Sequence, residues 1–370
     1  MLGHKGASVH VREMARALHG LGADVIVASS RVQDEGASLT AGVAVCEIPP
    51  VVPLRLSEAA LAGAVADQRA RVLDLCRDIR PDVVYERFAL FSDAGVRAAR
   101  RLGIPHLLEV NSPLRAEARR WRTLPHEQIA EKMEREVCRD TRRILCVSAG
   151  VATAIAGWAL PAKVEVLPNA IAPRLFEEPA ALAGHDVPTI GFAGSLKPWH
   201  GIETMLDAAV AVVGARPVVR FEIVGDGPLL GAVRESGLVP RHVTLHGAVD
   251  HDRAAALIRT WDIGLAPYDY QPGFYFSPLK VLEYMAAGIC PVASDQGQIR
   301  SLLGGGSRGV LVAPNDHEAL TSALLDLLDD RPRIAELARA ARGYVLARHT
   351  WERNASRVLE LAALARSRAA

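Results

Sequence analysis

The sequence predicts an α/β fold of two doubly wound domains, and three observations support this prediction. Short apolar runs alternate with longer amphipathic ones almost throughout, as expected for parallel strands separated by helices. The chain has 370 residues, enough for two domains at roughly 100–200 residues each. Half of the residues are apolar and 23% are charged, so both halves can bury a core.

In the first half, the apolar runs are short and bounded by polar segments, which is typical of buried parallel strands. Between them lie amphipathic segments such as residues 9–20, where Val11, Met14 and Leu18 recur at helical spacing. Strands are expected at residues 25–28, 83–85, 104–110, 144–147 and 164–167.

The second half repeats this alternation. A stretch with three prolines and no clear period, residues 172–188, has the composition of a linker. We therefore expect Rossmann-like domains at residues 1–171 and 188–345, with a ligand cleft between them at the carboxyl ends of the strands. Strands are expected at residues 190–193, 221–224, 243–245, 263–266, 291–293 and 310–312.

The start of the chain departs from this pattern. A doubly wound domain normally opens with an apolar strand in the middle of its sheet, but here Met1-Leu2 is followed at once by glycine and a helix. We expect either that a first strand of about five or six residues lies upstream of Met1, or that the sheet is completed in another way. The first explanation is favoured.

Composition argues against several classes of protein. With Lys+Arg 43 and Asp+Glu 42, the net charge is +1, too small for attachment to nucleic acid or an acidic membrane by bulk charge. The five cysteines are far apart, which argues against a disulfide framework or a zinc site and favours a reduced, cytoplasmic protein. The sequence has neither a run of 18 apolar residues nor a signal-peptide core at its start.

The strongest candidate for a binding site is the segment 273–293. A loop rich in glycine and aromatic residues enters a helix, with Ser277 expected as the N-cap and Pro278 in the first turn. Amides at a helix start bind anions, and Lys280 could add a cation. Glu283 could accept two hydrogen bonds from a vicinal diol such as ribose. This arrangement suits a nucleotide diphosphate; the alternative is an ordinary capped helix with a surface lysine.

This segment resembles the donor-binding motif of family 4 glycosyltransferases, which have the two-domain GT-B fold, through the run Ser277-Pro-Leu-Lys-Val-Leu-Glu-Tyr-Met-Ala-Ala-Gly followed by Pro291-Val-Ala. The resemblance extends from about residue 6 to 355, and several segments in register make it specific. The other matching segments are Gly6-Ala-Ser-Val-His-Val-Arg-Glu-Met-Ala, Val166-Leu-Pro-Asn, Gly194-Ser-Leu-Lys-Pro-Trp-His-Gly, Val224-Gly-Asp-Gly-Pro and Ala266-Pro-Tyr.

The resemblance implies a nucleotide-sugar donor and a transferase activity of the hexosyl type. In such enzymes the glutamate matching Glu283 holds the ribose, and the helix start at residues 277–280 receives the diphosphate. The family motif often has a second glutamate near the donor sugar, where this chain has Tyr275, so the sugar cannot be named. The candidate donor-binding residues are Gly6, Ser195, Gly225, Asp226, Ser277, Pro278, Leu279, Lys280 and Glu283.

The loop after Gly194 also departs from the family. Its members commonly carry an arginine and a lysine that neutralise the diphosphate, and ungapped alignment places Ser195 and His200 there, with Lys197 between them. Because the leaving diphosphate gains charge as the glycosidic bond breaks, a cation here favours the reaction. Lys197 is the first candidate for this catalytic role and His200 the second. The alternative for His200 is a loop histidine packed by Trp199.

Two further groups of polar residues have more than one interpretation. The run Asp250-His-Asp252 superficially resembles an Asp-x-Asp metal motif, but Asp252 is expected to cap the following helix, and no metal site is expected. The charged segment 114–142 is expected to be a solvated helix face, with membrane phospholipid contact as the minority alternative.

On the acceptor side, Glu109 could act as a base, orient the acceptor or be merely structural. The acceptor-side candidates are His10, Glu86, Arg87, Glu109 and Asn111.

The leading hypothesis is a metal-independent, cofactor-free transferase that moves a sugar from a nucleotide diphosphate to a small-molecule, glycan or lipid-linked acceptor. Family resemblance implies retention of the anomeric configuration and a C-terminal helix, residues 351–368, that returns to the first domain. No nucleic acid is expected as a partner, and membrane contact is expected to be peripheral at most. The alternatives are a GT-B-fold nucleotide-sugar 2-epimerase and an inactive nucleotide-sugar-binding protein lacking its first strand.

Overall fold

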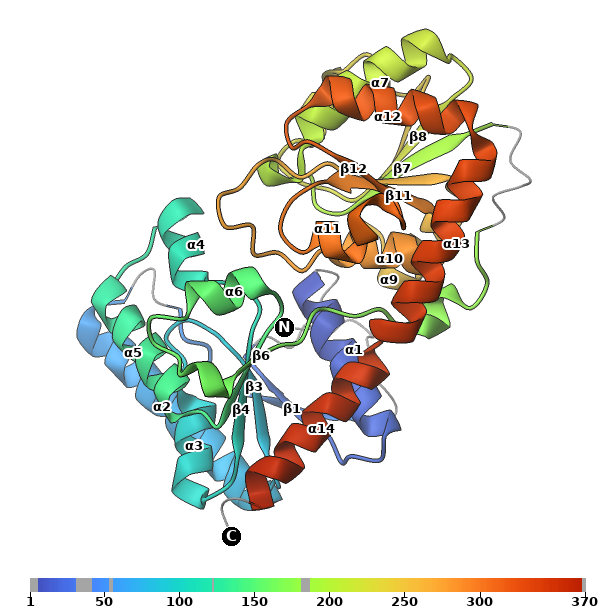
Figure 1. Ribbon diagram of the computed structural model, residues 1–370. Coiled ribbons are helices and arrows are strands. Elements are labelled where there is room, and N and C mark those ends of the chain that lie inside the picture. The colour runs from blue at the N-terminus through green and yellow to red at the C-terminus, as the bar shows by residue number, and fades with distance from the viewer. Residues whose placement is uncertain (1–5, 31–41, 53–55, 122, 181–186, 368–370) are drawn as a thin grey trace. The chain divides into compact units, whose positions relative to one another are not determined.

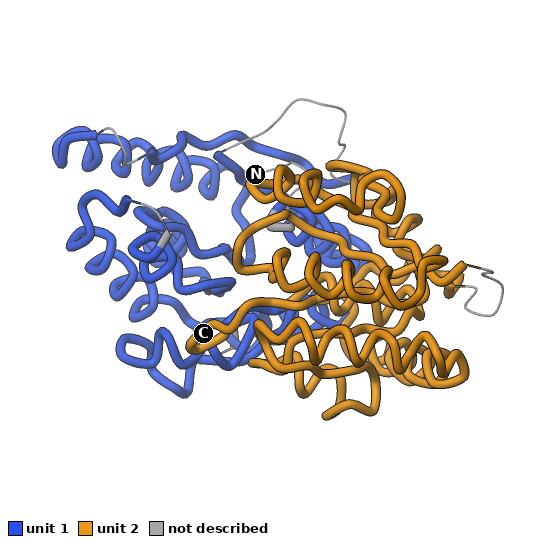
Figure 2. The backbone as a smooth tube through the Cα atoms, turned by 90° about the horizontal axis from the view of Figure 1, so that it is seen from above, with its two compact units in different colours: residues 1–169, 275–277, 351–370 blue, residues 170–274, 278–350 orange. Residues whose placement is uncertain are grey.

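The computed structural model describes residues 6–30, 42–52, 56–121, 123–180 and 187–367. The chain folds into two compact units. Unit 1 consists of residues 1–169, 275–277 and 351–370, and unit 2 of residues 170–274 and 278–350 (Figure 2). The short segment 275–277 had been expected in the second domain with the rest of the candidate donor motif. No helix in the described part of the chain is long and apolar enough to cross a membrane.

Unit 1 contains parallel strands with helices packed around them (Figure 1). Four strands pair in the order β3-β4-β5-β6, and β1 pairs with β2 in a separate two-stranded sheet. The strands are β1 (Ile26–Ser29), β2 (Ala44–Glu47), β3 (Val84–Arg87), β4 (His106–Val110), β5 (Arg143–Cys146) and β6 (Val164–Val166). The helices are α1 (Gly6–Gly20), α2 (Glu58–Ile79), α3 (Ala94–Leu102), α4 (Leu114–Trp121), α5 (Glu127–Asp140), α6 (Ala149–Ala154) and α14 (Trp351–Ser367).

The five strands predicted for this half are confirmed, and β2 was missed. Its four residues are only partly buried and form no long apolar run, so they give a weak signal. The first helix begins at Gly6, earlier than the predicted residue 9. A strand ahead of this helix would fall outside the described residues and stays a prediction.

Helix α14 packs along α1 within unit 1 (Figure 1). Trp351 at its start is buried, and its ring meets the ring of His10 edge-on at 4.6 Å between centroids. Val358 and Leu361, one helical repeat apart, are also buried. The apolar spacing of this helix therefore supplies the face that covers α1.

Unit 2 is a six-stranded parallel sheet in the order β12-β11-β10-β7-β8-β9, with helices on both faces (Figure 1). Its core is formed mainly by strand residues with the apolar faces of α7 and α12. All six predicted strands are confirmed: β7 (Thr189–Ala193), β8 (Arg220–Val224), β9 (Val243–Gly247), β10 (Ile263–Ala266), β11 (Cys290–Ser294) and β12 (Val310–Val312). The helices are α7 (Ile202–Ala215), α8 (Leu230–Glu235), α9 (His251–Ile258), α10 (Leu279–Ala287), α11 (Ile299–Leu302), α12 (His317–Asp329) and α13 (Arg331–Arg348).

Candidate donor and acceptor sites

The sheet of unit 2 reverses its strand order between β7 and β10, where α/β sheets usually bind ligands. The two strands pair only at their first halves, through Ile190 with Ile263 and Gly191 with Gly264, and then separate. The hydroxyl of buried Tyr284 lies in this opening, where it accepts a hydrogen bond from the Ala193 amide at 2.8 Å and donates to the Leu265 carbonyl at 3.1 Å. The carboxyl ends of the two strands are thus held apart.

Two glycine-containing loops meet at this opening. The Gly194 amide donates to the Val224 carbonyl at 2.9 Å, and a Cβ built on Gly225 would lie only 1.9 Å from the Gly194 carbonyl oxygen. Gly225, at φ 140°, therefore has to be glycine. The Asp226 carboxylate accepts a hydrogen bond from the next amide at 2.6 Å, so Asp226 stabilises the turn itself. Ser195 is exposed in the neighbouring loop.

Lys280, in the first turn of α10, has its ammonium group buried at this opening. Its Nζ lies 3.8 Å from the Phe192 ring centroid, 5.1 Å from that of Tyr268, and 3.0 Å from where a Cβ on Gly194 would stand. No hydrogen-bond partner for Nζ exists in the part of the chain that the structure describes. Burial lowers the pKa of Lys280 to about 7, against the opposing charge of Glu283. The alternative of a surface lysine is therefore wrong.

Glu283 follows one turn later on α10 and faces His251 at the start of α9. The Nε2 atom of His251 lies 2.8 Å from Oε1 of Glu283, and the two side chains are about equally and only slightly exposed. Because an ionised carboxylate can only accept, the histidine donates. No sequence pattern predicts this pair, because His251 lies inside the run that resembles a metal motif.

His200, the second candidate for stabilising the leaving diphosphate, does not carry the positive charge that this role requires. Burial and the charges of Lys280 and Lys197 lower its pKa to about 3, although its hydrogen bond to the Ser195 carbonyl acts in the opposite direction. Its ring packs edge-on against Tyr268. His200 is therefore neutral near pH 7, as the alternative of a packed loop histidine requires. Lys197 lies partly buried beside it.

The start of α10 differs from the predicted capped helix. The N-cap position is Pro278 and makes no side-chain cap, whereas Ser277 belongs to unit 1. There the Ser277 hydroxyl accepts from the Asn169 amide at 2.9 Å, and its carbonyl accepts from the Asn169 side chain at 2.8 Å. The prediction of Ser277 as N-cap is wrong, because a partner distant in sequence takes its hydroxyl. The first helical residue is Leu279.

The run Asp250-His-Asp252 is structured by helix capping and pairing. Asp250, not Asp252, caps α9 by accepting from the Arg253 amide at 2.7 Å, so the predicted cap was wrong by two residues. The carboxylate of Asp252 lies 3.6 Å from Arg174. Within the described ranges, no three His, Cys, Asp or Glu side chains cluster as metal ligands would.

In unit 1, Glu109 at the end of β4 is the centre of a buried polar group. It accepts from His10 at 2.9 Å and from the side chains of Tyr85 and Asn111. Burial alone would raise the pKa of Glu109, but His10, together with the charge of Arg87 and the Tyr85 hydroxyl, lowers it to about 2. Glu109 is thus an ionised carboxylate with its acceptor positions largely filled, which argues against a role as base.

His10 extends this group to the end of β6. Its Nδ1 atom lies 2.9 Å from Oδ1 of Asn169. The side-chain nitrogen of Asn169, Nδ2, donates to the Ser277 carbonyl. The Asn169 amide therefore points its oxygen at the ring, so Nδ1 must donate. Nε2 of the same ring faces the Glu109 carboxylate, so His10 links Asn169 to Glu109. In the sequence, Asn169 stands only at the end of the family motif Val166-Leu-Pro-Asn, and nothing there marks it as a site residue.

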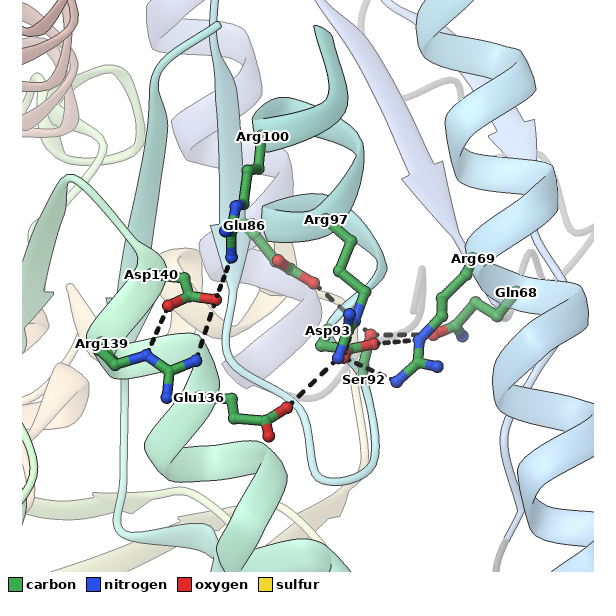
Figure 3. A network of polar contacts seen from close by, with 10 residues as sticks. All are labelled: Gln68, Arg69, Glu86, Ser92, Asp93, Arg97, Arg100, Glu136, Arg139 and Asp140. Atoms are coloured by element: carbon green, nitrogen blue, oxygen red, sulfur yellow. Dashed lines mark hydrogen bonds and ion pairs between the residues drawn. The ribbon is translucent and has the colours of Figure 1, made fainter. Parts of the chain in front are cut away.

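Glu86 does not belong to this group, contrary to the expectation for the acceptor side. Because strand side chains alternate, Glu86 points to the face of β3 opposite to Arg87 and Glu109. There it accepts from His106 at 2.8 Å, beside the hydroxyl of Ser92. Figure 3 shows it at the edge of an ion-pair network centred on Asp93, a structural link between α2 and α3.

Tyr275, which stands where the family motif often has a glutamate, contacts the charged segment 114–142 within unit 1. The Tyr275 hydroxyl donates to Glu117 of α4 at 2.6 Å, and its carbonyl accepts from Ser148 at 2.6 Å. Arg115 pairs with Glu134 of α5 at 3.0 Å and with further α5 carboxylates. The segment therefore balances much of its charge internally. Gly6, the remaining candidate, is the first residue of α1.

Comparison with known proteins identifies the family. Residues 4–175 match the family model described as Glycosyltransferase Family 4, and residues 187–330 match that described as Glycosyl transferases group 1. The chain belongs to the family 4 glycosyltransferases. This result confirms the resemblance and the GT-B fold predicted from the sequence, and it does not favour the epimerase or the inactive binding protein.

Individual relatives of this glycosyltransferase agree with that assignment. A D-inositol 3-phosphate glycosyltransferase from Thermobispora bispora is 26% identical, with 96% of this chain and 89% of the relative covered. A phosphatidyl-myo-inositol mannosyltransferase from Mycolicibacterium smegmatis is 31% identical, but the match spans 47% of this chain and 46% of the relative, about half of each.

Two solved structures share the fold of the glycosyltransferase. Sucrose-phosphate synthase from Thermosynechococcus elongatus has a TM-score of 0.76 at 20% identity and covers 97% of this chain and 94% of its own. Anabaena HepE, in complex with UDP and glucose, has a TM-score of 0.70 at 19% identity, with 97% and 96% covered.

Proposed function

We propose that this glycosyltransferase transfers a sugar from a nucleoside diphosphate sugar to an alcohol acceptor, with retention of configuration and without a metal or cofactor. The observation that carries the proposal is the buried ammonium of Lys280, which has no hydrogen-bond partner in the described residues and lies at the switch point of the sheet. A buried cation of this kind is costly unless an anion joins it, and a diphosphate supplies that anion.

The other groups of unit 2 suit the remaining parts of such a donor. The uncapped start of α10 presents amides to the same phosphates. Glu283, one turn further, accepts hydrogen bonds from the ribose hydroxyls, and the turn at Gly225 and Asp226 lines the base. Capping of α9 by Asp250 and pairing of Asp252 with Arg174 leave this run engaged in structure. These engagements support a reaction in which lysine side chains, rather than a metal, neutralise the diphosphate.

In the proposed reaction, the acceptor oxygen bonds to the anomeric carbon while the bond from that carbon to the diphosphate breaks on the same face. The departing phosphate oxygen takes the proton of the acceptor hydroxyl, so no protein base is needed. Negative charge grows on the diphosphate, and Lys280 and Lys197 stabilise it. Glu109 is assigned an orienting role, because it is ionised and its acceptor positions are largely filled.

The relatives narrow the first substrates to test. UDP accompanies one of the similar structures, and inositol phosphate and phosphatidylinositol appear in the names of two relatives. We therefore propose UDP as the first nucleotide to test, ahead of GDP and ADP, and a small or lipid-linked polyol as the acceptor class.

Product analysis tests the proposal. The chain is incubated with UDP-, GDP- and ADP-sugars, with and without polyol acceptors and with and without EDTA. We expect release of one nucleoside diphosphate only when an acceptor is present, unaffected by EDTA, and a product with the donor's anomeric configuration. Inversion would overturn the retaining mechanism, and loss of activity with EDTA would overturn metal independence. Conversion of the donor sugar without any acceptor would indicate an epimerase instead.

A further inference from the structure

The contact between His251 and Glu283 joins two helices of unit 2 at the candidate donor site. His251 is the first residue of α9, and Glu283 lies in the middle of α10. The Nε2 and Oε1 atoms are 2.8 Å apart, and the side chains are 15% and 17% exposed, so solvent competes little for this hydrogen bond. The backbone of His251 is fixed in turn by the Asp250 cap and by Ala255 and Ile258, which α9 buries.

A glutamate that has to accept from two neighbouring hydroxyl groups benefits from such a contact. Its side chain has three rotatable bonds, and a carboxylate that moves among rotamers loses binding free energy when a ligand fixes it. A hydrogen bond to one carboxylate oxygen selects one orientation in advance. Since a carboxylate offers about four lone-pair positions, the bond from His251 leaves enough of them for a diol.

The position of His251 argues against a purely structural explanation. A histidine in the first turn of a helix gains nothing from the helix dipole and is disfavoured there when it is charged. The N-cap role is already filled by Asp250, so His251 is not needed to begin the helix.

We propose that His251 is a positioning residue for the donor, which holds the carboxylate of Glu283 toward the vicinal hydroxyls of the ribose. This inference rests on the proposed function of the site. In this role, His251 contributes to the preference for ribonucleotide over deoxyribonucleotide donors. It does so through Glu283 and makes no contact of its own to the ribose.

A double-mutant cycle tests this. Calorimetry measures the dissociation constant of whichever of UDP, GDP or ADP binds the wild type, and of its 2′,3′-dideoxy analogue. His251→Ala should weaken binding of the ribonucleotide about 5- to 20-fold, and His251→Gln, which keeps a donor, should weaken it less. Addition of His251→Ala to Glu283→Ala should have less than a twofold effect. With the dideoxy analogue, His251→Ala should also have less than a twofold effect.

A matched control is available in the same unit. His246 donates to Glu222 at 3.0 Å, and these side chains are 20% and 23% exposed, so this second pair resembles the first in chemistry and burial. His246→Gln should leave nucleotide binding within twofold of the wild type. Equal melting temperatures of the His251 variants and the wild type would exclude loss of fold.

The outcomes separate the inference from the function that it deepens. If Glu283→Ala weakens ribonucleotide binding but His251→Ala does not, the positioning role of His251 is overturned while the donor site stands. The role is also overturned if His251→Ala weakens the dideoxy analogue as much as the ribonucleotide. If Glu283→Ala itself has no effect, the ribose assignment in the proposed function fails. In steady-state assays, His251→Ala should raise the donor KM and leave kcat within twofold. A fall in kcat as large as the rise in KM would overturn the positioning role of His251.

Discussion

Replacement of Lys280 by methionine should make the protein more stable while removing donor binding. The side chain is 7% exposed, and its ammonium lies over the faces of Phe192 and Tyr268, at 3.8 and 5.1 Å from the ring centroids, without a hydrogen-bond partner in the described residues. Methionine has a similar length and fills the same space without a charge. The structure thus predicts that this lysine is kept for its ligand and not for the fold.

The magnitude follows from the pKa. Burial lowers the pKa of Lys280 from 10.5 to about 7, and each pKa unit corresponds to about 1.4 kcal/mol, so the buried lysine costs about 4 kcal/mol near neutral pH. Between pH 7 and 10.5 the unfolded chain binds this proton more tightly than the folded chain does. Wild-type stability from this group should therefore rise with pH across that window and be constant below it.

Urea unfolding of the wild type and Lys280→Met at pH 7 and pH 10 measures this. Allowing for lost contacts with the rings, we expect the variant to gain about 2–4 kcal/mol at pH 7 and little at pH 10. Lys163→Met is the matched control, because the Lys163 ammonium donates to two backbone carbonyls and its removal should give no gain. A variant less stable than the wild type at pH 7, or a gain independent of pH, would refute the reasoning.

Three further predictions concern the other charged residues. Glu283→Ala should weaken nucleoside diphosphate binding by about 1.5–3 kcal/mol in calorimetry without a change in melting temperature, and unchanged affinity would show that the ribose assignment is wrong. Lys197→Ala should lower kcat more than donor affinity, because leaving-group charge grows toward the transition state, whereas His200→Ala, which removes a neutral ring, should change kcat much less; equal losses in kcat would contradict this assignment. Glu109→Gln should cost about 3–5 kcal/mol of stability, because it breaks a buried pair. Since the pKa of Glu109 is lowered to about 2, its contribution to the free energy of unfolding is present above about pH 4.5 and is lost as the pH falls toward 2. In urea titrations, the stability deficit of the variant relative to the wild type should therefore shrink only below pH 4.5. A deficit that shrinks nearer neutral pH would falsify the depressed pKa.

Strands could be predicted from the sequence because buried parallel strands are continuous apolar runs. In the part of the chain that the structure describes, eleven of the twelve strands coincide with predicted apolar runs, and the exception, β2, is half-exposed along its length. Helix α10 was also predictable, since a loop before Pro278 and the apolar period after it are local signals, whereas the anion site expected at its start stays a prediction.

Contacts between distant residues could not be predicted. Ser277 looked like an N-cap because serine before proline is the local pattern, but its hydroxyl is taken by Asn169, 108 residues away. The sequence singles out Lys280 as a candidate cation but does not predict its burial, because nothing nearby in sequence shows that Phe192 and Tyr268 cover it. Glu86 is adjacent to Arg87, yet the alternation of β3 places the two on opposite faces.

We propose that the buried ammonium of Lys280 receives the diphosphate of a nucleotide-sugar donor. Calorimetric titration of wild type and Lys280→Met with UDP, GDP and ADP, from pH 6 to 9, tests it most directly. At least one of these nucleotides should bind the wild type, with an affinity that falls as the pH rises above about 7, where free Lys280 loses its proton. Lys280→Met should bind that nucleotide at least tenfold more weakly and without this pH dependence. Equal binding by the two proteins, or no binding of any of the three nucleotides by the wild type, would contradict it.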